Sequence, residues 1–225
     1  MPMIDLPTVK AKWPITSSSQ MLLSLLSTVV IISLSCVRSN EAQAQQIFAD
    51  GTTETATGDI DMGTISGTMG IALRARNGGV INTIPPLTIT TGGSNAIAVQ
   101  ATFASEITLS SGTSIYTRGS GADGVVSSGN SQVHIIDTDI RTDNIGYGII
   151  AGTSGRIDVI NSTVNARIGT GIAAFSGGEI TLNDSIVTTG SGLALWVQDM
   201  NSTLTGTGLT ITSDADRGAV VLQGT

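Results

Sequence analysis

Three stretches of the chain share one register, starting at Gly124, Gly148 and Gly171, which lie 24 and 23 residues apart. Each stretch begins with glycine and a short apolar run, passes through a turn of small residues and enters a second apolar segment. Self-similarity at a period of about 20 to 50 residues is the signature of a repeat protein. Because one such repeat cannot bury its apolar face alone, the repeats must stack on one another.

The clearest repeats each contain three short apolar segments. Alternation of apolar and polar residues in the second segment is typical of a strand with one buried face. Three strands in each repeat predict an all-β fold, a right-handed parallel β-helix in which equivalent residues stack about 4.8 Å apart. The predicted columns are Ile149 between Val125 and Ile172, Ile157 between Val133 and Ile180, Arg156 between Gln132 and Glu179, and a structural corner ladder of Asp137, Asn161 and Asp184.

The same register extends to further repeats, with starts near Gly70, Ala96, Gly192 and Gly218. The predicted organisation is a signal peptide over 1–44, an N-terminal cap or irregular first rung over 45–69, and β-helix repeats of about 21–28 residues over 70–225. The pair Pro85-Pro86 cannot donate backbone hydrogen bonds and therefore marks a corner or a bulge. An antiparallel sandwich or barrel would share the turn spacing, but the copies at a nearly fixed offset favour the β-helix.

The composition agrees with short strands joined by tight turns. The chain has 28 Gly, and only 12% of its residues are charged, about half the fraction usual in globular domains. Its single cysteine, Cys36, lies near the N-terminus.

The N-terminus has the order of a secretory signal. Lys10 and Lys12 precede an apolar run over 21–34, and Ala42-Gln43-Ala44 then provides a small-x-small cleavage site before Gln45. The alternatives are an uncleaved membrane anchor and a lipoprotein signal at Cys36. Cleavage after Ala44 would leave a mature chain with no thiol, so that packing and hydrogen bonds alone would hold it together.

The charge of the mature segment is strongly negative. Seven Arg, no Lys and fifteen Asp plus Glu leave a net charge of about −8 after residue 44. A surface of this sign repels phosphate groups. The sequence therefore predicts no nucleic-acid partner and no anionic-lipid partner.

Taken together, the leader ending in Ala42-Gln43-Ala44, the mature chain without cysteine and the repeated Gly-apolar, turn, apolar-x-apolar, Asp/Asn-Ser/Thr pattern resemble the passenger region of a bacterial autotransporter of the pertactin-like type. The resemblance covers residues 45–225. It implies a non-enzymatic cell-surface or secreted β-helix that serves in adhesion or virulence and binds host-cell or matrix surface components. Loops such as Arg118–Asp123 and Arg141–Tyr147 would make these contacts.

The resemblance also implies a C-terminal outer-membrane barrel, and no series of alternating strands of about 10 residues is present to build one. We therefore expect an N-terminal fragment of a longer surface protein, or a truncated product that would reach the periplasm and have no function of its own.

An enzyme is the alternative, since parallel β-helices also carry polysaccharide lyases and hydrolases. Such chemistry needs paired carboxylates, and Asp137, Asp139 and Asp158 are the candidates, with Arg141 or Arg156 as basic partners. Asp and Asn at corners also arise from turn geometry alone. We favour that interpretation and expect no catalytic residue.

No cofactor or metal site is expected either. The lone His134 has no second His or Cys to share a metal with and is expected to lie exposed on a strand. Trp196 and Tyr147 are expected to be isolated aromatic residues, with Trp196 packed in the core or exposed as a contact residue.

Overall fold

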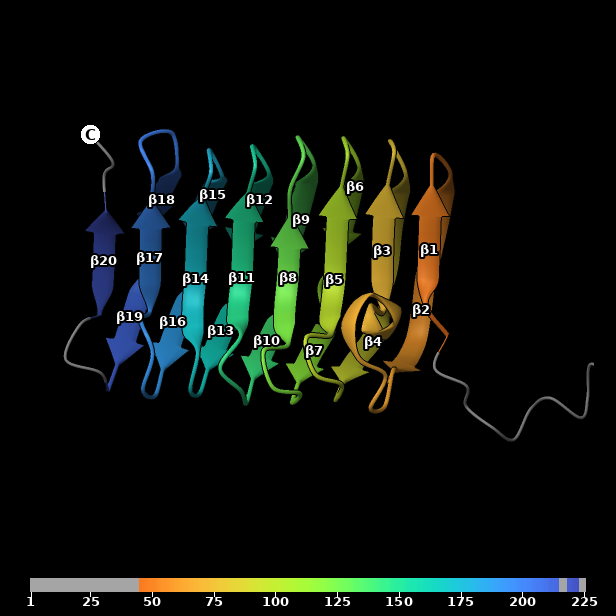
Figure 1. The fold of residues 1–225 in the computed structure, drawn as a ribbon, viewed down its shortest axis with the longest axis horizontal. Helices are drawn as coiled ribbons and strands as arrows, with labels where there is room; N and C mark the ends of the chain where they lie inside the picture. Colours follow the sequence, from red (N-terminus) through yellow and green to blue (C-terminus); the bar gives the residue numbers. More distant parts are fainter. Residues whose placement is uncertain (1–44, 215–217, 223–225) are drawn as a thin grey trace, which may run out of the picture. The chain divides into compact units, whose positions relative to one another are not determined.

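The fold was obtained as a computed structural model, which describes residues 45–214 and 218–222 (Figure 1). It is an all-β parallel solenoid of about seven turns, as predicted. The predicted signal peptide, with Ala42 and Ala44 at its cleavage site, lies outside the described residues. Gln45 is the first described residue, and it is exposed.

One side of the solenoid is an eight-stranded parallel sheet made of the first strand of each turn. Figure 1 shows these strands side by side, with the sequence running steadily along the stack. In spatial order they are β1 (Ile47–Asp50), β3 (Leu73–Arg76), β5 (Ile97–Thr102), β8 (Asp123–Ser127), β11 (Tyr147–Gly152), β14 (Thr170–Phe175), β17 (Leu195–Gln198) and β20 (Ala219–Leu222).

The other strands form a second parallel sheet with two arms. One arm holds β6 (Glu106–Leu109), β9 (Gln132–Ile136), β12 (Arg156–Ile160), β15 (Glu179–Asn183) and β18 (Thr203–Thr207). The other arm holds β7 (Thr113–Thr117), β10 (Asp139–Thr142), β13 (Thr163–Ala166), β16 (Ile186–Thr189) and β19 (Thr210–Ser213).

The long strand β4 (Val80–Thr91) joins the two arms. Its first residues pair with β6 and its last residues pair with β7. It also pairs with β2 (Thr53–Asp61), and the register of that pair shifts where Thr57 meets Ile84 and Gly58 meets Leu87. The two skipped residues are Pro85 and Pro86, so the predicted bulge is confirmed.

The predicted apolar columns form the core. Ile149 pairs with both Val125 and Ile172, and Ile157 pairs with both Val133 and Ile180 in the next sheet. Ile149 and Ile157 have no solvent exposure. Because every turn contributes the same inward positions, the core is one continuous cluster along the stack rather than a separate core in each repeat.

The register of three predicted repeat starts is wrong by two residues. The pairing of β14 with β17 aligns Ile172 with Leu195, so Ala194 and not Gly192 corresponds to Gly171. In the same way, Ala72 and Ala98 replace Gly70 and Ala96. Small residues occupy two columns two positions apart, and a pattern of small residues cannot distinguish them. The columns are 72, 98, 124, 148, 171, 194 and 70, 96, 122, 146, 169, 192.

Both columns demand small residues because neighbouring turns approach closely there. A Cβ atom at Gly171 would lie 2.7 Å from the backbone oxygen of Ala194, and one at Gly169 would meet the oxygen of Gly146. Contacts this short leave no room for a larger side chain.

Residues 45–69, predicted as a cap or irregular first rung, contribute β1 and β2, which pair in parallel with β3 and β4. The only described helix, the short 3-10 helix η1 (Gly67–Gly70), follows them. Within the described residues, no helix has the length and apolar character needed to cross a membrane.

Replacing Ile149 with Ala should lower the free energy of unfolding by about 2–5 kcal/mol, because the substitution leaves a cavity in a column that cannot collapse. The measurement is urea unfolding followed by circular dichroism. Ile145→Ala is the matched control: Ile145 is 67% exposed, and its replacement should change stability by no more than about 0.5 kcal/mol. Equal losses in the two variants would contradict a continuous packed column.

Candidate functional site

The corner ladder is a column of residues in the left-handed backbone conformation. Asp137, Asn161 and Asp184 have φ of 46°, 50° and 49°. Backbone hydrogen bonds run along the column: Asp137 N–H donates to Ile160 and Asn161 N–H to Asn183. Glycine, Asn and Asp adopt this conformation at the lowest cost. The ladder is extended at its two ends by Gly112 and Gly208, which also have positive φ.

Hydroxyl groups buried next to the ladder complete the corner. Ser162 Oγ accepts a hydrogen bond from Thr138 N–H (3.1 Å), and Ser185 Oγ accepts one from Ser162 N–H (3.2 Å). The Ser162 and Ser185 hydroxyls also donate back to the backbone oxygens of Ile160 and Asn183. The Asp/Asn-Ser/Thr motif therefore builds a turn.

The three candidate catalytic carboxylates lie on different elements. Asp137 is in the corner itself, Asp139 follows the corner at the start of β10, and Asp158 precedes it on β12. Asp158 Oδ2 lies 3.3 Å from His134 Nδ1 and accepts a hydrogen bond from Gln132 (3.1 Å). Each carboxylate thus has a structural position in the turn or on the outer face of the strand.

The His134 side chain is part of an outward polar network on the arm of β6, β9 and β12. It is 32% exposed, and its Nε2 lies 3.9 Å from Glu106 Oε1. On the same face, Arg156 lies between Gln132 and Glu179, as predicted, and its Nε is 3.0 Å from Glu179 Oε2. Arg156 and Glu179 also line a groove of about 620 Å³ that runs along the neighbouring turns.

The expectation that Trp196 and Tyr147 are isolated is wrong. Their rings stack with centroids 6.2 Å apart, and Phe175 lies edge-on to both, at 5.9 Å from Tyr147 and 5.6 Å from Trp196. Ala173 pairs with Trp196 and faces away from the core, because it alternates with the core residues Ile172 and Ala174. Ala173 is nevertheless fully buried. Trp196 therefore packs outside the sheet, where three aromatic rings gather over a small residue.

Next to this aromatic cluster lies a carboxyl group in an unusual environment. Asp123 Oδ1 accepts a hydrogen bond from Tyr147 N–H (2.9 Å). Burial raises the pKa of Asp123 to about 6, and the hydrogen bond opposes this only in part. The same burial, together with the nearby Asp123 charge, raises the pKa of Tyr147.

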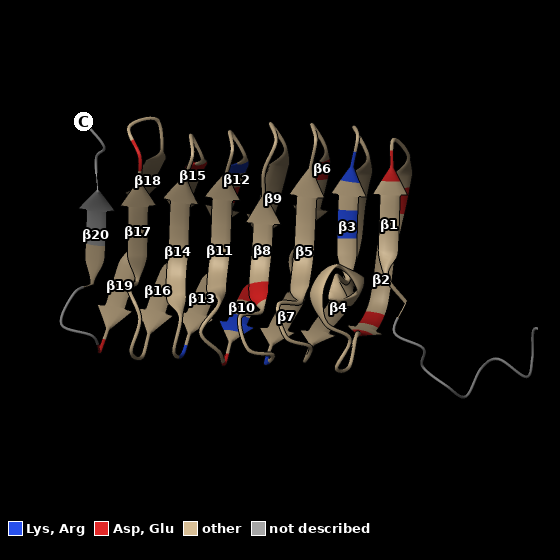
Figure 2. Cartoon of the chain, in the orientation of Figure 1, with Lys and Arg blue, Asp and Glu red and all other residues tan. Residues whose placement is uncertain are grey.

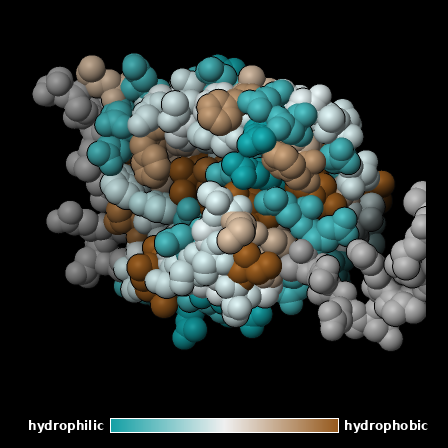
Figure 3. Space-filling view, turned by 45° about the vertical axis from the view of Figure 1, so that its right-hand side comes forward, coloured by the Kyte–Doolittle hydropathy of each residue, from teal (hydrophilic) through white to brown (hydrophobic). Residues whose placement is uncertain are grey.

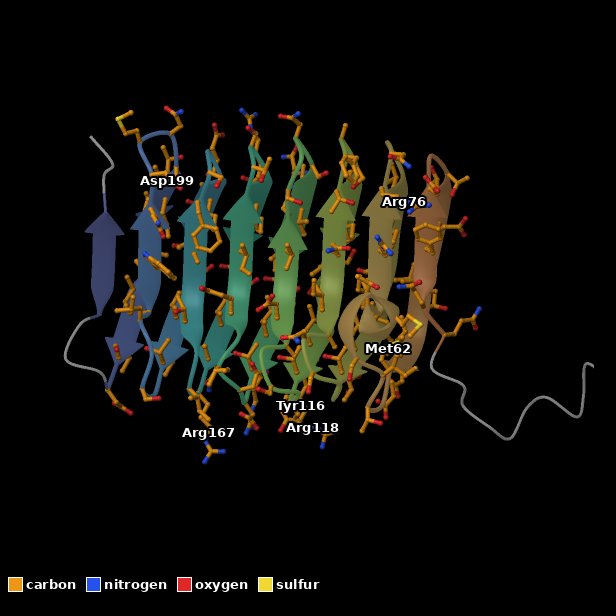
Figure 4. All side chains as sticks on the ribbon, viewed as in Figure 1. Met62, Arg76, Tyr116, Arg118, Arg167 and Asp199 are labelled. Atoms are coloured by element: carbon orange, nitrogen blue, oxygen red, sulfur yellow. The ribbon has the colours of Figure 1, made fainter. Side chains whose placement is uncertain are left out.

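The strongest local concentration of positive charge lies on the arm of β7, β10 and β13. We call it the arginine edge and define it as Tyr116, Arg118, Arg141, Asp143 and Arg167. Figure 2 shows positive charge at the lower ends of this arm, and Figure 4, in which Tyr116, Arg118 and Arg167 are labelled, shows these three side chains at the lower edge of the stack. Three of the seven arginines that follow residue 44 therefore lie on neighbouring turns.

The centre of the arginine edge is tightly bonded. Arg141 donates two hydrogen bonds to Asp143, both of 2.9 Å, and Tyr116 Oη donates another of 2.6 Å. The guanidinium groups of Arg118 and Arg141 lie 5.0 and 5.2 Å from the Tyr116 ring centroid, within the range of cation–π attraction.

These bonds shift the pKa values of the groups involved. Hydrogen bonds from the Arg141 guanidinium are the largest cause that holds the pKa of Asp143 below its usual value. Burial opposes this lowering, and the hydrogen bond from the Tyr116 hydroxyl adds to it by a lesser amount. The Asp143 carboxylate in turn raises the pKa of Tyr116 and that of Arg141. The edge therefore keeps its charges over the physiological pH range.

The face at the β1 end of the stack is mixed rather than dominated by one property. Figure 3, with the β1 end turned forward, shows hydrophobic residues in separate patches among hydrophilic ones. Over residues 45–214 and 218–222, no group of three or more His, Cys, Asp or Glu side chains is placed to hold a metal ion. No family model matches the chain, and neither a curated protein nor a solved structure matches it.

Two features of this surface, the arginine edge and the aromatic cluster, were not predicted from the sequence. The loops Arg118–Asp123 and Arg141–Tyr147 were predicted as contact loops, whereas Arg167 was not. The three aromatic rings come from strands that are neighbours only in the fold. A signal for the arginine edge does exist: Arg118, Asp143 and Arg167 occupy the same position after three consecutive third strands.

Asn161→Val should destabilise the chain by about 1–2 kcal/mol or more, because a β-branched residue tolerates the left-handed conformation poorly. Asn161→Gly should leave stability nearly unchanged, since glycine has no such penalty. Asn165→Val is the matched control, because Asn165 is exposed on β13 and valine suits a strand. Thermal unfolding measures all three, and an unaffected Asn161→Val variant would refute the conformational role of the ladder.

Asp123→Asn should stabilise the chain at neutral pH. Because the folded-state pKa is raised to about 6, the native chain binds the proton more tightly than the unfolded chain does. The contribution of Asp123 is therefore most favourable below about pH 4 and is lost as pH rises through 6. The Asp123→Asn variant avoids this loss of folding stability, which is on the order of 1–3 kcal/mol. Denaturant titrations at pH 4 and 7.5 should give a larger advantage for Asp123→Asn at pH 7.5; an advantage that does not depend on pH would contradict the burial of an ionised carboxylate.

Proposed function

We propose that the chain is a non-enzymatic binding solenoid, displayed on a bacterial surface or secreted as the passenger region of an autotransporter, and that it serves in adhesion. The observation that carries this proposal is the arrangement of the outward-facing side chains. The solenoid holds outward side chains at fixed intervals along its stack, and two such groups, the aromatic cluster and the arginine edge, are built from several turns. Aromatic and arginine side chains are the types that contribute most to binding at protein surfaces.

The structural positions of the carboxylates support binding over catalysis. Asp137 and Asp184 lie in left-handed corner positions that glycine also fills in the same column, so turn geometry is sufficient to explain them. On the outer face, Asp158 accepts a hydrogen bond from Gln132, and its carboxylate lies 3.3 Å from His134 Nδ1. Export is supported by the sequence alone, through the order of charged, apolar and small residues before Gln45.

The location of the product tests display. Antibody to residues 45–225 should label intact cells that produce the chain, and external protease should remove that signal. Antibody to a cytoplasmic protein on the same cells is the control for cell integrity. A product confined to the cytoplasm or the periplasm would contradict surface display.

A separate experiment tests whether the chain binds its partners or degrades them as an enzyme. Purified chain should bind host cells or matrix in a saturable way and should release no fragments from acidic polysaccharides. The variant with Asp137, Asp139 and Asp158 all changed to Asn should bind as well as the unaltered chain. Polysaccharide degradation that this variant lacks would establish the enzymatic alternative and overturn the proposal.

A further inference from the structure

Two arginines of the arginine edge form no ion pair with any residue that the structure describes. Within residues 45–214 and 218–222, neither Arg118 nor Arg167 forms an ion pair, whereas Asp143 is already engaged by Arg141 and Tyr116. Both Arg118 and Arg167 are exposed. The edge therefore holds three guanidinium groups against one carboxylate. Two of them form no ion pair and reach solvent: Arg118 lies against the Tyr116 ring, and Arg167 is within electrostatic reach of Asp143.

The spacing of these two arginines is set by the backbone. Arg118 N–H donates to Thr91, Asp143 N–H to Thr117 and Arg167 N–H to Thr142, so the three residues hold equivalent places on successive turns. Arg118 and Arg167 are two turns apart, a backbone separation of roughly 10 Å. Their long side chains can converge on one small anion above Asp143 or contact two parts of a single ligand.

The turn between them is held in place. Asn144 is buried, and its Nδ2 donates to Thr117 Oγ1 (3.2 Å). Asp143 is only 14% exposed, while its partner Arg141 is 53% exposed. Because these groups are fixed before any ligand arrives, binding need order only the outer guanidinium groups, which lowers its entropic cost.

Exposed apolar side chains lie in the same two loops as Asp143 and Arg167. Ile168 follows Arg167 directly and is 44% exposed, and Ile145 on the preceding turn is 67% exposed. A Cβ atom at Gly169 would lie 2.9 Å from the Ile145 carbonyl carbon, so the two turns stack closely. A ligand that fits this surface carries an oxyanion for the guanidinium groups and an apolar face for the isoleucines.

The charge of the rest of the chain limits the size of that ligand. The segment after residue 44 has a net charge of about −8, which opposes the approach of a long polyanion such as a nucleic acid. A compact ligand with one anionic group experiences mainly the local excess of positive charge. Arginine is suited to it because its planar fork matches the two oxygens of a carboxylate.

From this surface we infer that the arginine edge binds an acidic sugar, with Arg118 and Arg167 holding its carboxylate and Ile145 and Ile168 contacting its ring or an apolar substituent. Arg141, Asp143 and Tyr116 are positioning residues that support Arg118 and keep the centre of the edge rigid. The inference rests on the proposed binding function and names the class of partner: glycans that end in a carboxylated sugar.

The test is binding of the purified chain to sialyllactose and to tri-galacturonate, with neutral lactose and inorganic phosphate as comparators. We expect saturable binding of at least one acidic sugar, weakened by added salt, and no binding of lactose. The double variant Arg118→Gln and Arg167→Gln should bind at least about tenfold more weakly. Arg156→Gln is the matched control, because it removes an exposed arginine paired with Glu179 on another arm, and it should bind normally.

Three results would overturn the inference: no binding of either acidic sugar, tighter binding of phosphate than of both, or equal loss of binding in the Arg156→Gln variant. Circular dichroism of each variant shows whether a loss of binding reflects misfolding. The double variant Arg118→Lys and Arg167→Lys then tests the site in a folded chain. Because lysine keeps the positive charge but lacks the planar fork of arginine, this variant should restore binding only in part.

The cell-adhesion assay separates this inference from the proposed function. If the chain is displayed and mediates adhesion that the double variant retains, the function stands and the acidic-sugar site fails. If the purified chain binds acidic sugars but is never displayed, the site stands and the adhesion function fails.

Discussion

The structure depends on one constraint: each turn must lie in parallel register with the turns before and after it. In such an arrangement the backbone N–H and C=O groups of one strand form hydrogen bonds with the equivalent strand of the next turn, and not with a hairpin partner. A single turn is therefore not stable by itself. The register fixes which side chains stack. Ile149 lies between Val125 and Ile172, and every other column follows from the same alignment, including the outward ones that form the candidate binding surfaces.

The corners satisfy this constraint in two different ways. One corner bends the chain between the two arms through left-handed residues. Gly, Asp and Asn fill this column because their energetic cost in that conformation is low; its members are Gly112, Asp137, Asn161, Asp184 and Gly208. Another corner brings neighbouring backbones so close that only small residues fit, as at Gly146 and Gly169. Carboxylates in the first corner are thus part of the turn chemistry, and the acidic residues of a β-solenoid are a poor guide to catalysis unless their corner roles have been accounted for.

The same geometry brings outward side chains of different turns together. Side chains that are 24 or 25 residues apart in the chain, such as Arg118, Asp143 and Arg167, become neighbours at the spacing of strands in a sheet. A solenoid can therefore assemble a binding surface from one position in each turn, without a cleft. Arg118, Asp143 and Arg167 form such a column, whereas Tyr147, Phe175 and Trp196 come from three different positions on neighbouring turns. Both groups lie next to buried residues: Asn144 in the arginine edge and Ala173 at the aromatic cluster.

The sequence by itself determined the periodic part of this protein. The offset of Val125, Ile149 and Ile172, the alternation around Ile157 and the recurring Asp or Asn at 137, 161 and 184 are enough to predict a parallel solenoid and its main columns, because one repeated residue pattern implies one repeated backbone. The tertiary structure decided what the repeat leaves free. It distinguished the two small-residue columns, moving the alignment from Gly192 to Ala194, and it brought Tyr147, Phe175 and Trp196 together. These features depend on side-chain packing between turns, which a pattern along one chain does not encode.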